Sequence, residues 1–237
     1  MIISANQPYF APFPGLFYKI LCSDIFVVLD DIQFPRGFTW MTRNRFKNDQ
    51  GTLWMTIPVQ KKGLGLQNID AVRIYHEGRW ACKHLSSLKN AYANAPYFKE
   101  HLPLLDTLFA SGFLSGFEKL IDLNLEIIRY LLKLLDIDTK MILLSELGIQ
   151  ARGNRLLIEI CRALGASRYL AQSPARKYLD PDLFRDAGIE LTYFRPPSLI
   201  YPQLWGSFIP NLSAFDLVFN CGPKARAILT AAKETIP

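Results

Sequence analysis

The chain has 237 residues, of which 50% are hydrophobic and 20% charged, a composition that supplies the core of a large domain and excludes intrinsic disorder. Its apolar runs stay short of the roughly 20 residues that a bilayer-spanning helix needs, and Met1–Asn6 lack the basic and apolar regions of a secretory signal. We therefore expect a cytoplasmic protein without an integral membrane segment.

Charge and cysteine content narrow the ligand classes further. The formal net charge of +6 favours an anionic ligand. The basic residues are scattered, however, and no zinc-finger or RNP-type motif accompanies them, so we expect no nucleic-acid partner. The four cysteines lie far apart and form no CxxC pair, which predicts reduced thiols and no metal site.

The first elements in chain order follow a β-α-β pattern. Residues 1–5 and 25–29 are short, apolar and partly β-branched, as in buried strands, and residues 16–23 leave room for one helix between them. This pattern predicts a parallel sheet, whose second strand ends in the acidic pair Asp30-Asp31.

Residues 35–135 are predicted to form an insertion or lid. Segments 39–47 and 53–59 flank the turn NDQG and predict a β-hairpin, with Arg43 and Arg45 on one face and Asn44 on the other. Helices are predicted over 79–91, after Pro96, and over 117–135, where apolar residues on more than one side indicate burial.

The C-terminal half repeats the alternation. Strands are predicted over 141–144, 168–171 and 189–194, and helices over 154–164 and 181–187, each closed by a glycine. The whole chain, 1–237, is therefore predicted to be one α/β domain, a Rossmann-like parallel sheet with an inserted β-hairpin and helical segment. Near the end, Asp216 on an apolar stretch is expected to be a structural hydrogen-bonding residue.

The stretch NQPYFAPFPG follows the first predicted strand. Ligands of open parallel sheets bind beyond the carboxyl ends of the strands, where the strand order reverses. Prolines stiffen this loop, and Gly15 lets the backbone pass closely into a helix N-terminus, which favours an anion. We predict substrate-binding roles for Gln7, Tyr9 and Gly15. The alternative is a structural loop whose aromatic residues pack in the core.

Several motifs in series resemble the WbqC-like family of bacterial proteins. They are QPYFAPFPGLFYKI, SDIFVVLDDIQFPRGFTWMTRNRFK, LWMTIPV, WACKHLSSLKNAYANAPYF and LSAFDLVFNCG, and they run from Gln7 to Gly222. The resemblance implies O-antigen (lipopolysaccharide) biosynthesis and transfer of glycine or another aminoacyl group to a sugar. The chain departs from the family at Thr42, where relatives often have asparagine, and in residues 172–177 before Tyr178, where a proline and two positive charges are expected to alter ligand preference.

Candidate catalytic residues are few. Transfer of an acyl group needs a base and donors for the oxyanion. His84 and Lys83 lie on the helix of the family-like WACKH motif, and Asp30 ends a buried strand at the expected crevice. Local packing of His84 and capping of a loop by Asp30 are the structural alternatives. No GxSxG or Cys-His signature nominates a nucleophile.

Candidate ligand-binding residues outside the loop are arginines and neutral polar residues. Arginine clamps phosphate with two parallel donors, as the diphosphate of a nucleotide sugar requires. The candidates are Gln33, Arg43, Asn44, Arg45, Arg176, Tyr178 and Gln203, with solvated charges as the alternative for the arginines.

The first hypothesis is thus a transferase that moves a glycyl, aminoacyl or acyl group onto an amino sugar, bound as a nucleotide-linked or lipid-linked sugar. A non-catalytic module that binds an anionic sugar is the second. An ATP-dependent amide ligase resembling pantothenate synthetase is the third, although Phe13 and Leu16 replace the two histidines of that loop. ATP as a cofactor, the donor, the acceptor and the oligomeric state stay open.

Overall fold

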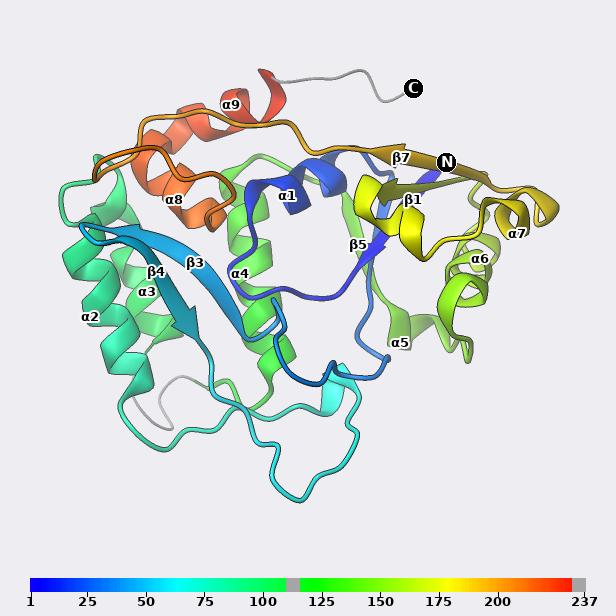
Figure 1. The fold of residues 1–237 in the computed structure, drawn as a ribbon, viewed down its shortest axis with the longest axis horizontal. Coiled ribbons are helices and arrows are strands. Elements are labelled where there is room, and N and C mark those ends of the chain that lie inside the picture. Colours follow the sequence, from blue (N-terminus) through cyan, green and yellow to red (C-terminus); the bar gives the residue numbers. More distant parts are fainter. Residues whose placement is uncertain (110–115, 232–237) are drawn as a thin grey trace.

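A five-stranded, fully parallel sheet forms the centre of the protein (Figure 1). The structure is a computed structural model that describes residues 1–109 and 116–231. The strands lie in the order β5-β2-β1-β6-β7, with bounds β1 Ile2–Asn6, β2 Ile25–Val28, β5 Lys140–Leu143, β6 Arg168–Gln172 and β7 Glu190–Phe194. The order reverses between β1 and β6, because the chain builds outward to β5 and then returns beside β1. This topology confirms the predicted Rossmann-like sheet.

Helices cover both faces of the sheet, which is why its strands are apolar on both sides. On one face α5 (Leu144–Leu147), α6 (Gly153–Ala163) and α7 (Pro181–Asp186) enclose a core around Ile3 and Val27. On the other face α1 (Pro14–Leu21) separates the sheet from α4 (Leu120–Leu134), α8 (Ala214–Cys221) and α9 (Ala225–Ala231). Phe26 and Val28 belong to the larger core on that side.

The predicted hairpin is present as a separate antiparallel pair, β3 (Arg43–Asn48) and β4 (Gly51–Thr56). The first strand begins later than predicted, because residues 40–42 form a turn in which the Thr42 amide donates to the Thr39 carbonyl at 3.3 Å. The inserted segment continues with α2 (Trp80–Tyr92), α3 (Leu102–Leu108) and α4. Short 3-10 helices complete the fold: η1 Ile69–Ala71, η2 Phe98–His101, η4 Ser173–Lys177 and η5 Gly222–Lys224. Residues 110–115 of the predicted insertion lie outside the described residues.

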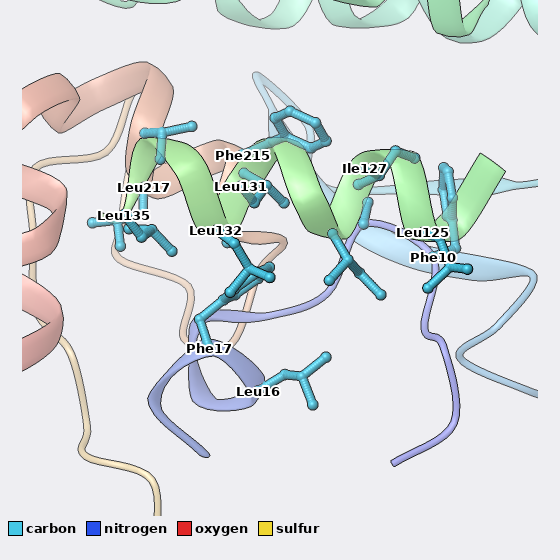
Figure 2. Packing of buried hydrophobic residues seen from close by; sticks show 14 of the residues in the cluster. Phe10, Leu16, Phe17, Leu125, Ile127, Leu131, Leu132, Leu135, Phe215 and Leu217 are labelled. Carbon is cyan, nitrogen blue, oxygen red and sulfur yellow. The ribbon is translucent and has the colours of Figure 1, made fainter. Parts of the chain in front are cut away.

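Helix α4 is buried on several sides, as its sequence predicts. Figure 2 shows Leu131 and Leu132 between Phe17 of α1 and Phe215 of α8, while Leu125 meets Phe10 of the proline-rich loop. The insertion and the sheet therefore share one core.

Candidate functional site

Two buried asparagines hold the proline-rich loop that follows β1. Asn44 of β3 donates through Nδ2 to the carbonyls of Phe10 and Ala11, both at 2.9 Å. Asn124 of α4 donates to the carbonyl of Pro8 at 2.8 Å and to that of Met41 at 2.9 Å. Ala11 adopts a left-handed φ of 42°, which is unfavourable for a residue with a Cβ atom. The loop conformation is thus imposed by side chains of the inserted segment.

A pocket of about 500 Å³ lies beyond the carboxyl ends of β1, β6 and β7. Three segments line it: the start of α1, the end of β6, and the long connection from β7 to α8, here called the β7–α8 connection (195–213). The lining residues are Phe13, Pro14, Gly15, Gln172, Pro174, Pro196, Pro197, Ser198, Leu199, Ile200, Tyr201, Phe208, Pro210 and Asn211. Because β1 and β6 are the neighbours between which the order reverses, this is the switch-point crevice expected for the fold.

Gly15 permits the close approach of α1 to the β7–α8 connection. A Cβ atom at this position would lie 2.4 Å from Cε2 of Phe13 and 2.8 Å from Cβ of Pro196. Among the residues that the structure describes, no side chain caps the N-terminus of α1. The pocket therefore meets a helix end that carries a partial positive charge, as the sequence predicts.

Gln172 contributes a buried amide donor to the pocket wall. Its Nε2 is buried and has no hydrogen-bond partner among the described residues. The neighbouring Ser173 donates through Oγ to the Phe194 carbonyl at 2.9 Å, which ties the ends of β6 and β7 together. An amide donor without an acceptor at a pocket wall is suited to a ligand oxygen.

The β7–α8 connection is anchored to the hairpin by charged side chains. Nη2 of Arg45 donates to the Asn211 carbonyl at 2.9 Å, and Nζ of the buried Lys47 donates to the Ser207 carbonyl at 2.7 Å. Gln203 stabilises the connection internally. Its Nε2 donates to the Ile209 carbonyl at 3.0 Å, and its Oε1 accepts from the Ile209 amide at 2.9 Å. Two residues predicted to bind substrate, Arg45 and Gln203, thus build the pocket wall.

A buried polar network lies behind this wall. The Tyr92 hydroxyl donates to Oδ2 of Asp216 at 2.8 Å and accepts from the Lys47 amide at 2.9 Å. Burial raises the pKa of Asp216, although the hydrogen bond from Tyr92, the nearby Tyr201 hydroxyl and the charge of Lys47 oppose the rise. Among the described residues, Oδ1 of Asp216 has no hydrogen-bond partner. Asp216 is therefore a structural hydrogen-bonding residue, as predicted, and it is not one of the residues that line the pocket.

Lys19 of α1 is a buried lysine that was not among the predicted site residues. It is 4% exposed, and its Nζ donates to the Ala5 carbonyl at 2.7 Å, with Oδ1 of Asn6 at 3.5 Å. Burial lowers the pKa of Lys19 to about 7. The sequence indicates this residue only through its position as a lysine within the apolar run LFYKIL. A lysine at such a helix position faces either solvent or the sheet.

The three predicted catalytic residues lie away from the pocket. Oδ1 and Oδ2 of Asp30 accept from the amide and hydroxyl of Ser145, at 3.0 and 2.5 Å, and so cap the start of α5. His84 contacts the Thr56 carbonyl at 2.9 Å through Nε2, and burial lowers its pKa. Lys83 is exposed on α2. None of them lines the pocket, and their catalytic roles stay predictions.

The remaining predicted ligand residues are dispersed. Gly15 lines the pocket, Asn44 holds the loop, and Arg176 stacks on the Tyr193 ring at 4.1 Å close to the pocket residue Pro174. The others lie elsewhere: Gln7 is half-buried, Tyr9 packs against the core, Gln33 bridges Asn68, Arg43 lies among aromatic rings, and Tyr178 is exposed. Their ligand contacts stay predictions.

Most of the pocket was missed because it comes from the β7–α8 connection. The signal was available in Pro196-Pro197, which follow the last strand as Pro12 and Pro14 follow the first. Ligands of open parallel sheets bind beyond the carboxyl ends of the strands. This rule applies to the β7–α8 connection as it does to the proline-rich loop after β1, because both leave the same edge of the sheet.

Within residues 1–109 and 116–231, no three or more His, Cys, Asp or Glu side chains form a group that could hold a metal ion. Over the same residues, no helix has the length and hydrophobicity required to cross a membrane.

Strand order and pocket position define a Rossmann-like α/β protein with its candidate site at the switch point. Residues 7–228 match the WbqC-like protein family, and the chain belongs to that family. It is 31% identical over 234 residues to a protein of Mycobacterium tuberculosis (strain ATCC 25618 / H37Rv) described as Uncharacterized protein Rv1507c, a match that covers 98% of this chain and 99% of the relative. No solved structure matches the chain.

Proposed function

We propose that the protein is a transferase of bacterial surface-polysaccharide (O-antigen) assembly, which binds a nucleotide-linked amino sugar in the switch-point pocket and moves a glycyl, other aminoacyl or acyl group onto its amine. The observation that carries the proposal is the pocket itself. Its volume of about 500 Å³ suits a small organic ligand, and it combines an uncapped helix N-terminus with the free amide of Gln172. The pathway comes from the family resemblance.

In this reaction the sugar amine attacks the acyl carbon of an activated donor. A bond forms between nitrogen and carbon, the bond to the leaving group breaks, and the amine proton departs with the leaving group or a base. The chain would contribute positioning and hydrogen-bond donors to the oxyanion. We assign these tasks to Gln172 and the N-terminus of α1.

A non-catalytic sugar-binding module is the second candidate. The observation in its favour is that, among the described residues that line the pocket, none is charged and none is a histidine. In this alternative the same nucleotide-linked sugar binds, but no group is transferred.

A thermal-shift screen of the purified protein tests the proposal, because a ligand that binds the folded state raises its apparent stability. The panel contains UDP-linked amino sugars, coenzyme A, acetyl-coenzyme A and ATP. We expect a shift with a UDP-linked amino sugar that is lost in Gln172→Ala and kept in the exposed control Gln150→Ala. A shift with ATP alone would support the amide ligase, and no shift with any compound would contradict the pocket assignment.

Mass spectrometry of the bound sugar then separates the two candidates. After incubation with a glycyl or acetyl donor, a gain in mass on the amine supports the transferase. Tight binding of the sugar without a gain in mass, with every donor tried, supports the binding module.

A further inference from the structure

Three touching aromatic side chains gather on the exposed side of the hairpin. Trp40 and Trp54 lie nearly parallel, with ring centroids 6.0 Å apart and an interplanar angle of 25°, and Phe38 meets both rings edge-on. Phe38 is 55% and Trp54 41% exposed. Single exposed aromatic residues are common on protein surfaces, but a contiguous group marks an interaction site.

Arg43 completes this group, here called the aromatic–arginine platform (Phe38, Trp40, Arg43 and Trp54). Its Cζ lies 4.0 Å from the ring centroid of Trp54 and 5.1 Å from that of Phe38. Its Nε is buried without a hydrogen-bond partner, and Arg43 joins no ion pair, within the part of the chain that the structure describes. A guanidinium that stacks on a ring directs its Nη N–H groups sideways in its own plane, where a carboxylate or phosphate can bind.

The platform continues toward the pocket along the outer face of the hairpin. Arg45 is the cross-strand partner of Trp54 and shares its face with Arg43, because side chains alternate along a strand. Arg45 in turn holds the carbonyl of Asn211, a residue of the pocket lining, at 2.9 Å. One side chain thus connects the platform with the pocket wall.

We propose that the aromatic–arginine platform binds an acidic saccharide. The apolar C–H face of a sugar ring packs on an indole, and Arg43 pairs with the carboxylate or phosphate of the sugar. Non-specific binding of a nucleic-acid strand uses a continuous basic groove. The platform instead holds one arginine against its aromatic rings, and the neighbouring Arg45 is bonded to the Asn211 carbonyl. The inference rests on the proposed function, since it assigns the platform to further sugar units of a glycan whose reacting sugar lies in the pocket.

The test is a ligand-observed NMR titration of the whole protein with trigalacturonic acid and with a neutral trisaccharide of galactose. We expect both to bind and the acidic one to bind more tightly. Trp54→Ala should weaken the binding of both trisaccharides at least about tenfold, a change of about 1.4 kcal/mol. Arg43→Gln should lower the affinity for the acidic trisaccharide to that for the neutral one. The matched control is Trp80→Phe, which alters a tryptophan that is held on α2 by the Tyr75 carbonyl and should bind as the parent protein does.

Three results would overturn the inference. They are unchanged affinity in Trp54→Ala with its thermal unfolding intact, tighter Trp54-dependent binding of a short oligo(dT) strand, and a Trp54-dependent dimer in sedimentation. Failure here is distinguishable from failure of the proposed function. The UDP-sugar thermal shift should survive Trp54→Ala, and the trisaccharide titration should survive Gln172→Ala.

Discussion

Replacing Lys19 by methionine should change how the stability of the protein depends on pH. The unfolded lysine has its ordinary pKa of 10.5, whereas burial lowers the pKa of the folded one to about 7. Between these values the unfolded chain binds the extra proton, so the free energy of unfolding rises with pH. Above both values Lys19 has no such effect, and below the lower value its full penalty of about 5 kcal/mol applies, at 1.36 kcal/mol for each pKa unit of the 3.5-unit difference.

The assay is urea unfolding of the parent protein and Lys19→Met from about pH 6.5 to about pH 9. Over this range the penalty falls by about 2.5 kcal/mol in the parent alone, so the difference between the two proteins should change by that amount. Methionine also leaves the Ala5 carbonyl without its donor, a cost of about 1–3 kcal/mol that does not depend on pH. Lys83→Met on the exposed surface of α2 controls for loss of a charge. Parallel curves for parent and Lys19→Met would refute the reasoning.

Three further substitutions test the loop, the pocket and the network behind it. Asn44→Ala should lower the free energy of unfolding by about 2–4 kcal/mol, because two carbonyls lose their donor in the core. Asn44→Asp keeps the shape of the side chain without the donor and should lower the free energy of unfolding at least as much. An unchanged free energy of unfolding in both variants would contradict the role of Asn44. Gly15→Ala should cost about 1–3 kcal/mol by overpacking against Pro196 and reduce the UDP-sugar thermal shift; a stable variant with an unchanged shift would argue against the pocket. Tyr92→Phe should cost about 1–3 kcal/mol in urea unfolding, since it leaves the Asp216 carboxylate short of a donor, and stability equal to that of the parent would show that the network tolerates the loss.

The sheet was predictable from the sequence because its signals are local. The apolar run of β2 and the glycines that close α6 and α7 each mark an element without reference to the rest of the chain. The helix after β1 was predicted two residues late, since Pro14 and Gly15 usually interrupt helices; Pro14 occupies the first helical position, where its missing N–H costs nothing.

The site was harder to predict because it depends on contacts between distant residues. Asn44 belongs to a family-like motif, and nothing in its neighbours shows that its amide holds the loop at Phe10 and Ala11. Arg45 looks like an anion ligand in sequence, but its partner is a main-chain carbonyl 166 residues away. The close packing at Gly15 could be predicted because it follows from a strand-to-helix turn, which is local.

The capture of the Pro8 carbonyl by Asn124 spans 116 residues of sequence. Contacts at such separation form late, because the chain between them must first be ordered. The loop beside the pocket should therefore acquire its shape only after the inserted helices have assembled. A nascent chain that ends before α4 contains β1 and β2, but its proline-rich loop lacks the hydrogen bond from Asn124. In native-state hydrogen exchange, the amides of residues 9–11 and of α4 should accordingly open together as one cooperative unit.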